Sequence, residues 1–117
     1  MALPRVLIID DSEAVLAHGR AVLGGRYSVT TARDGAEGLE RARSIRPSAI
    51  LLDLSMPEMD GEQVLAALAR DAVLSAIPVI VVSSERERAE RCVDLGAAAV
   101  LHKPAATEEL IRTLDRL

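Results

Sequence analysis

Five side chains with acid, hydroxyl or amine chemistry stand at or just past the ends of short apolar runs: Asp10, Asp11, Asp53, Ser83 and Lys103. Three carboxylates brought together repel one another and raise each other's pKa unless a cation joins them. A hard divalent cation that prefers oxygen ligands, such as Mg²⁺, is the natural partner of such a group. These residue types therefore predict a cation site with a lysine and a hydroxyl beside it, if the fold brings them together.

The elements that must position these residues alternate along the chain. Short apolar runs predict buried strands over residues 5–9 and 49–52, and a further strand over residues 78–82. Residues 27–32 are rich in residues that favour strands, and residues 97–101 predict a weaker strand. Helical periodicity predicts helices around residues 15–23, 36–43, 64–68 and 85–95 and from residue 107 onward. Five successive βα units predict one α/β domain, with a parallel sheet between helix layers and right-handed crossovers.

In open parallel sheets the carboxyl ends of the strands form one edge, where ligands bind beside the point at which strand order reverses. Neighbouring strands lie about 4.8 Å apart, so acids that end adjacent strands converge. Each residue also has a simpler explanation: Asp11 or Ser12 can cap the next helix, as can Ser83 with Ser84, and Lys103 can be a solvated charge. We favour a shared site, because independent caps would not also place a lysine at that edge.

Composition narrows the classes of function. The 117 residues carry a net charge of −4, with 13 arginines against the single Lys103 and with Tyr27 as the only aromatic residue. An acidic chain without Phe or Trp is a poor match for broad phosphate-backbone binding or base stacking. The single cysteine, Cys92, allows no internal disulfide, and no apolar run reaches the roughly 18 residues of a membrane span. We therefore expect a soluble, cytoplasmic domain without direct nucleic-acid or membrane partners.

The ordered motifs resemble response-regulator receiver domains, the CheY-like domains of two-component signalling, along essentially the whole chain. The resemblance rests on Asp10-Asp11, Asp53 before Leu54-Ser55-Met56-Pro57-Glu58-Met59-Asp60-Gly61, Ser83, and Lys103-Pro104. It implies a flavodoxin-like (βα)5 fold, a three-layer sandwich around a five-stranded parallel sheet of strand order 2-1-3-4-5. It also implies that residues 1–117 form a single receiver domain, and it leaves open whether residue 117 is a natural end or a boundary before an output domain.

By the same resemblance the domain is a regulatory phosphoacceptor rather than a turnover enzyme. Asp53 would receive a phosphoryl group from a phosphohistidine on a histidine kinase or a histidine phosphotransfer protein. Asp10, Asp11, Asp53 and the backbone carbonyl of Ser55 would hold Mg²⁺. A carboxylate that attacks phosphorus must approach another anion, so the positive charge of a metal ion suits this chemistry.

The remaining implied roles fall on the fourth and fifth strands. Ser83 would donate its hydroxyl to a phosphoryl oxygen, Lys103 would pair with another, and the Lys103-Pro104 bond would be cis. The output partner or domain is unidentified, and the resemblance implies that it is reached through the fourth helix, fifth strand and fifth helix.

The chain departs from the family pattern at positions that matter for output. Val100 stands where an aromatic residue usually precedes the lysine by three positions, and Ala105 replaces a frequent aromatic after Lys-Pro. An aromatic swing at Val100 is therefore impossible. Ser55 and Glu85 occupy positions at which the family varies phosphoryl lifetime, and our hypothesis is that Glu85 influences water access or repels the phosphoryl group.

We interpret the other polar residues as structural. The expected placements are His102 facing away from Lys103, His18 on a helix surface, Cys92 in the core with Ala89 and Val93, and residues 85–88 as a solvated charge pattern.

Two alternative functions stay open. A degenerate receiver could act as a phosphorylation-independent interaction module. Val100, which replaces the usual aromatic residue, is consistent with this alternative. A phosphatase of the haloacid dehalogenase type also uses an aspartyl phosphate, but it expects Asp-x-Asp, and Asp53-Leu54-Ser55 lacks the second carboxylate that would serve as acid and base.

Overall fold

A computed structural model describes residues 3–56, 58–104 and 107–117, and the expected features at Pro57 and Ala105 lie outside this described part. The strands are β1 (Arg5–Ile9), β2 (Ser28–Ala32), β3 (Ala49–Asp53), β4 (Val79–Ser83) and β5 (Ala99–His102). The helices are α1 (Glu13–Leu23), α2 (Gly35–Ile45), α3 (Gly61–Arg70), α4 (Arg86–Arg91) and α5 (Thr107–Asp115), with a short 3-10 turn at Leu74–Ala76.

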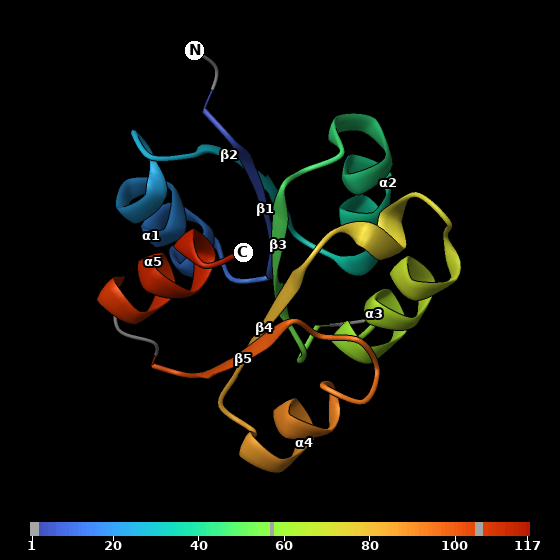
Figure 1. Cartoon of the computed structure of the whole chain (residues 1–117). Helices are drawn as coiled ribbons and strands as arrows, with labels where there is room; N and C mark the ends of the chain where they lie inside the picture. The colour runs from blue at the N-terminus through green and yellow to red at the C-terminus, as the bar shows by residue number, and fades with distance from the viewer. Residues whose placement is uncertain (1–2, 57, 105–106) are drawn as a thin grey trace.

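All neighbouring strands pair in parallel, in the order β2-β1-β3-β4-β5. Helices α1 and α5 cover one face of the sheet, and α2, α3 and α4 cover the other (Figure 1). This is the flavodoxin-like three-layer sandwich that the sequence predicts.

Alternation along the strands creates two apolar cores, one on each face of the sheet. Leu7 and Ile9 of β1 join the core beneath α2 and α3, whereas Val6 and Ile8 join the core beneath α1 and α5. All four side chains are buried. Burial on both faces explains why β1 is a continuous apolar run rather than an alternating one.

Strand order reverses at β1, which lies between β2 and β3 although it comes first in the chain. Ile9 pairs with Leu52 across the β1–β3 ladder. Asp10 and Asp53 directly follow these two residues, so they lie side by side at the crevice where open α/β sheets bind ligands.

Local hydrogen bonds settle which residues act as caps. The side chain of Ser12, not of Asp11, caps α1 by accepting from the backbone N–H of Val15. Asp60 and Gln63 form a reciprocal capping box that starts α3 directly after the loop containing Ser55. At α4 the cap position is Glu85, whose own side chain makes no capping bond. The hydroxyl of Ser83 instead accepts the backbone N–H of Glu85, at the start of this helix.

Two details of the predicted helices are wrong. The fourth helix ends at Arg91 rather than Leu95, because the chain continues in successive turns, among them Asp94 N–H to Arg91 O and Leu95 N–H to Cys92 O. Val15, the first residue of the helical periodicity predicted over residues 15–23, and Val93, expected in the core with Cys92, are 37% and 56% exposed. Their neighbours Leu16 and Cys92 take the buried positions instead. Within the described residues, no helix combines the length and apolarity required to span a bilayer.

Candidate functional site

The three predicted acids meet at the carboxyl edge of the sheet. Asp10 and Asp53 are 3% and 6% exposed, and Asp11 beside them is exposed. One carboxylate oxygen from each of the three lies within 4.8 Å of the other two. Three convergent anionic oxygens are the donor set that a hard divalent cation takes, so these side chains fit such an ion.

Lys103 reaches the same place from the end of β5. Its Nζ lies 3.2 Å from Asp53 Oδ1 and 3.4 Å from Asp10 Oδ2. The preceding strand carries it there, and the Lys103-Pro104 bond is cis, as expected. Burial opposes the charge of Lys103, but the two carboxylates outweigh it and raise the pKa of its ammonium group. Lys103 therefore stays charged at neutral pH.

Asp53 experiences opposing influences. Burial and the neighbouring charge of Asp10 raise the pKa of its carboxyl group, while Lys103 and the backbone N–H of Ser55 act to lower it, and the net direction is upward. Asp10 is held differently, because its Oδ1 accepts the backbone N–H of Ser12 at 2.9 Å. The cluster is thus anionic and only partly compensated by one ammonium group.

Ser83 ends β4 and is 2% exposed. Val82 pairs with Asp53 across the β3–β4 ladder, so Ser83 lies one step beyond the phosphoacceptor candidate at the same edge. Its Oγ accepts the backbone N–H of Glu85 at 3.0 Å. The hydroxyl hydrogen remains free to point elsewhere, because this contact uses the oxygen as the acceptor.

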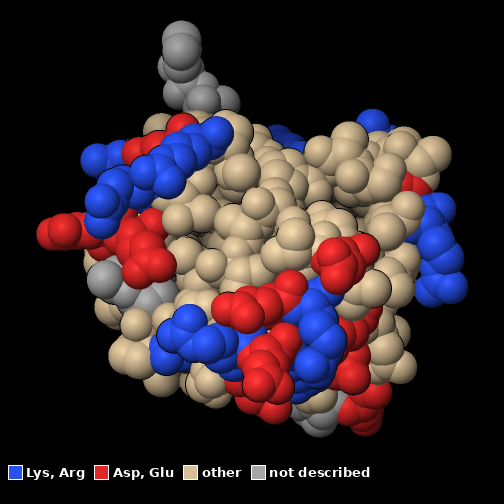
Figure 2. Space-filling view, turned by 60° about the horizontal axis from the view of Figure 1, so that its bottom comes forward, with Lys and Arg blue, Asp and Glu red and all other residues tan. Residues whose placement is uncertain are grey.

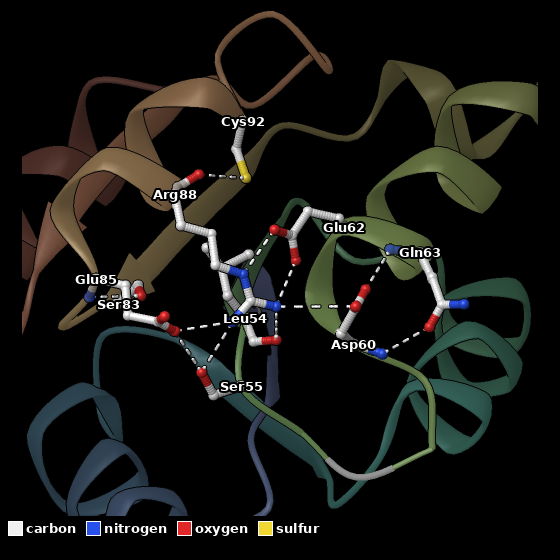
Figure 3. A network of polar contacts seen from close by, with 9 residues as sticks. All are labelled: Leu54, Ser55, Asp60, Glu62, Gln63, Ser83, Glu85, Arg88 and Cys92. Atoms are coloured by element: carbon white, nitrogen blue, oxygen red, sulfur yellow. Dashed lines mark hydrogen bonds and ion pairs between the residues drawn. The ribbon is translucent and has the colours of Figure 1, made fainter.

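Arg88 forms a network that our sequence interpretation missed (Figure 3). Its guanidinium donates to both carboxylate oxygens of Glu62 at 2.6 Å, and to the carbonyl of Leu54 at 2.9 Å. It also contacts Ser55 Oγ at 3.1 Å and Glu85 at 2.8 Å. The run 85–88 is therefore not a wholly solvated pattern.

A signal for this role was present in the spacing of the sequence. Arg88 lies four residues before the buried Cys92 and next to the buried Ala89, which places it at the edge of the inward face of α4. Its side chain is 21% exposed, whereas that of Arg86 on the same helix is 70% exposed. Arg86 and Glu87 do match the expectation of solvated charges.

The histidines play no part in the acidic cluster. His102 Nε2 lies 3.9 Å from Glu90 of α4, on the side of the sheet away from α1 and α5, and His18 is exposed on α1. Cys92 is fully buried, as predicted, and Val100 is half-buried against the core beneath α4.

A mainly apolar cavity of about 580 Å³ adjoins the site between α1, α5 and the sheet. Ile8, Leu51, Val82 and Leu110 line it, and Asp53 contributes to its wall. On the face shown in Figure 2, acidic and basic side chains lie intermingled, so the described residues there do not gather positive charge into one broad area.

Comparison with known proteins gives a consistent answer. The sequence pattern of the response regulator receiver domain matches residues 6–115. The transcriptional regulatory protein PrrA of Mycobacterium tuberculosis is 40% identical, over 97% of this chain and 49% of PrrA. Protein PilH of Pseudomonas aeruginosa is 34% identical, over 95% of this chain and 94% of PilH. The chain thus spans about half the length of its PrrA relatives.

Solved structures agree in fold. The chemotaxis protein CheY4 of Vibrio cholerae superimposes with a TM-score of 0.90 at 31% identity, over 98% of both chains. The receiver domain of the sensor histidine kinase PA1611 of Pseudomonas aeruginosa, which has a magnesium ion coordinated in its active site cleft, gives a TM-score of 0.90 at 27% identity over 98% of this chain and 97% of that one. The chain belongs to the response regulator receiver domains, the regulatory signalling domains of two-component systems.

Proposed function

We propose that this chain is a phosphoacceptor switch in which Asp53 takes a phosphoryl group from a histidine kinase or a histidine phosphotransfer protein. The observation that carries the proposal is the pairing of buried Asp53 with Lys103 at 3.2 Å, beside two further carboxylates. A nucleophilic carboxylate, a fixed cation and a set of metal-ligand oxygens are the parts that phosphoryl transfer requires.

In the proposed step, a carboxylate oxygen of Asp53 attacks phosphorus and forms the O–P bond of an acyl phosphate. The P–N bond to the donor imidazole breaks, and its electron pair returns to the ring nitrogen. Lys103 already lies against Asp53 and can follow the negative charge onto a phosphoryl oxygen. Its ammonium is a compact point charge on a flexible stem, which suits a crowded site better than a planar guanidinium.

Asp10, Asp11, Asp53 and the Ser55 backbone carbonyl would hold Mg²⁺, which when bound neutralises charge on the transferring oxygens. Support for the ion comes from the convergent carboxylates of this chain and from the magnesium ion in the related PA1611 domain. Lys103 alone leaves the cluster with an excess of negative charge, which a divalent cation would balance.

We further propose that Ser83 transmits the modification. Its hydroxyl can donate to a phosphoryl oxygen, and its position directly before the β4–α4 loop would draw that loop and α4 toward Asp53. Output would then leave through α4, β5 and α5. An aromatic swing cannot contribute, because the position on β5 is Val100.

We propose that the chain acts as one receiver domain whose output lies in a separate domain or partner. The PrrA relatives carry further sequence of about the same length as the matched part, and PrrA is a transcriptional regulatory protein.

Beryllofluoride, a mimic of the phosphoryl group, tests the proposal in solution. With Mg²⁺ present, we expect it to shift the backbone amide resonances of residues 53–55, 83–85 and 103, and to shift none of them in Asp53→Asn. If neither protein responds, Asp53 is not the phosphoacceptor and a phosphorylation-independent interaction module becomes the better reading. Sustained release of phosphate from a generic phosphomonoester would favour the dehalogenase-type phosphatase instead.

A further inference from the structure

The Arg88 network joins α4 to the backbone that follows the phosphoacceptor. Arg88 is the third residue of α4, and its guanidinium extends to the start of α3 and to the loop after β3 (Figure 3). Two N–H groups engage Glu62 of α3 in a bidentate pair, and the Nη2 that takes part in it also donates to the carbonyl of Leu54. A single side chain thus bridges three segments of the chain.

The carbonyl that Arg88 binds belongs to a peptide unit next to the reactive carboxylate. The Leu54–Ser55 peptide offers its C=O to Arg88 and to the backbone N–H of Gly61, at 2.9 and 3.0 Å. The N–H of the same peptide belongs to Ser55, two residues after Asp53, and a backbone hydrogen bond from Ser55 acts to lower the pKa of the Asp53 carboxyl group. Since a peptide unit is planar and rigid, fixing its carbonyl also fixes its N–H.

Two side chains near the mouth of the site are held in the same network. Ser55 Oγ donates to Glu85 Oε2 at 2.8 Å, and Arg88 contacts both of these residues. The Glu85 carboxylate is shared with a hydroxyl and a guanidinium, so its negative charge is partly compensated, and the hypothesis that Glu85 influences water access or repels the phosphoryl group stays a prediction. Arg88 is partly buried, with 21% of its side chain exposed, and four of its contacts are 2.9 Å or shorter.

We propose that Arg88 is a positioning residue for Asp53 and couples the placement of α4 to the reactivity of that carboxylate. This inference rests on the proposed role of Asp53 as phosphoacceptor. A shift of α4 moves the guanidinium, and the guanidinium turns or releases the Leu54–Ser55 peptide. At equilibrium such coupling is reciprocal, so a protein that binds α4 will shift the phosphorylation equilibrium by the same factor by which phosphorylation changes its affinity.

The contacts of Arg88 explain why position 88 is an arginine rather than a lysine. Holding Glu62 with two N–H groups while reaching the Leu54 carbonyl requires the planar fork of a guanidinium. A lysine at position 88 would keep the charge but lose this simultaneous grip. Arg88→Lys should therefore restore only part of the function that Arg88→Gln removes.

The test compares Arg88→Gln and Arg88→Lys with Arg86→Gln, a control on the same helix whose arginine is 70% exposed and 4.0 Å from Glu90. With acetyl phosphate and Mg²⁺, we expect Arg88→Gln to slow phosphorylation about tenfold or more. A loss of this size is usual when a residue is removed that holds the groups of a site in place without contacting the reacting atoms. Arg88→Lys should be intermediate, and Arg86→Gln should stay within about twofold of wild type, as expected for an exposed charge.

A second readout needs neither metal nor phosphodonor. In the metal-free protein, the Ser55 amide resonance and its hydrogen-exchange protection should change in Arg88→Gln and not in Arg86→Gln. If Arg88→Gln does not unfold cooperatively, Glu62→Gln, which leaves Arg88 in place but removes its charged anchor, should produce the same change in smaller degree.

The outcomes separate the two claims. If acetyl phosphate does not phosphorylate wild type, Asp53 is not the phosphoacceptor. The Ser55 amide resonance would still report whether Arg88 holds the Leu54–Ser55 peptide in place. A labelled wild type together with an equally fast Arg88→Gln, or an unchanged Ser55 amide in that variant, would overturn the coupling and leave the phosphoacceptor proposal standing.

Discussion

Replacing Asp53 by asparagine should make the metal-free protein more stable. Asp53 is almost fully buried, carries a raised pKa, and shares its site with Asp10 and Asp11. Asparagine has nearly the same shape and keeps an oxygen that can accept from Lys103. The substitution therefore removes one negative charge and changes little else.

The expected magnitude follows from three opposing contributions. At an effective dielectric constant of about 20, the 3.2 Å contact with Lys103 corresponds to about 5 kcal/mol of attraction. At the upper limit of 4.8 Å between carboxylate oxygens, repulsion from one neighbouring acid is about 3.5 kcal/mol. Desolvation of a buried carboxylate adds a penalty of roughly several kcal/mol, so repulsion and burial together exceed the attraction. We expect Asp53→Asn to gain about 1–2 kcal/mol, because part of the Lys103 contact survives as a hydrogen bond.

Urea unfolding of both proteins in EDTA at pH 7 measures this difference. Because the pKa of Asp53 is raised in the folded protein, its unfavourable ionised form disappears as the pH falls. The extra stability of Asp53→Asn should therefore vanish below the ordinary aspartate pKa of about 3.9. Addition of Mg²⁺ should stabilise wild type more than the variant, since a ligand that binds the native state stabilises it by mass action.

The opposite order in EDTA would refute this reasoning. If Asp53→Asn is less stable than wild type at pH 7, Lys103 outweighs burial and repulsion, and the site is a stabilising ion pair rather than a centre held at a cost to the fold. Asp94→Asn, at an exposed carboxylate, is the matched control for loss of one negative charge.

Three further predictions concern the scaffold. Gly38→Ala would place a Cβ 2.5 Å from Ile9 Cδ1 and 2.9 Å from its Cγ1, so we expect urea unfolding to show a loss of about 1–3 kcal/mol, and an unchanged midpoint would contradict the packing of α2 on β1. Burial and the hydrogen bond to Asp115 raise the pKa of Tyr27 to about 12. The free energy of unfolding of wild type should therefore exceed that of Tyr27→Phe below pH about 10, and the difference should shrink as the pH approaches 12; a constant difference would argue against that bond. Cys92 is fully buried and the pKa of its thiol is raised by burial, so a thiol-specific reagent should label it rapidly in denaturing urea and slowly in buffer, and rapid labelling in buffer would show that α4 opens readily.

The strand ends and the site they carry could be predicted because both are encoded locally. Each buried strand is a short apolar run, and a polar residue ends the run where the backbone leaves the sheet, as Asp53 does for β3 and Ser83 for β4. Parallel pairing then brings these positions to one edge without further information. The capping of α1 was open between Asp11 and Ser12, and only the structure decides for Ser12.

The Arg88 network could not be predicted in the same way. Glu62 lies 26 residues before Arg88, and their pairing depends on how α3 and α4 pack against the sheet. A Glu-Arg-Glu-Arg run reads equally well as a solvated helix when its neighbours in space are unknown. Val15 and Val93 illustrate the related limit: periodicity marks an apolar face, but Leu16 and Cys92 fill the space beneath α1 and α4.

Intact-mass measurement after incubation with acetyl phosphate and Mg²⁺ tests the central claim most directly. We predict that wild type gains the mass of one phosphoryl group, that peptide mapping places it on Asp53, and that EDTA or Asp53→Asn abolishes the gain. Equal labelling of wild type and Asp53→Asn, or no labelling of either, would contradict it.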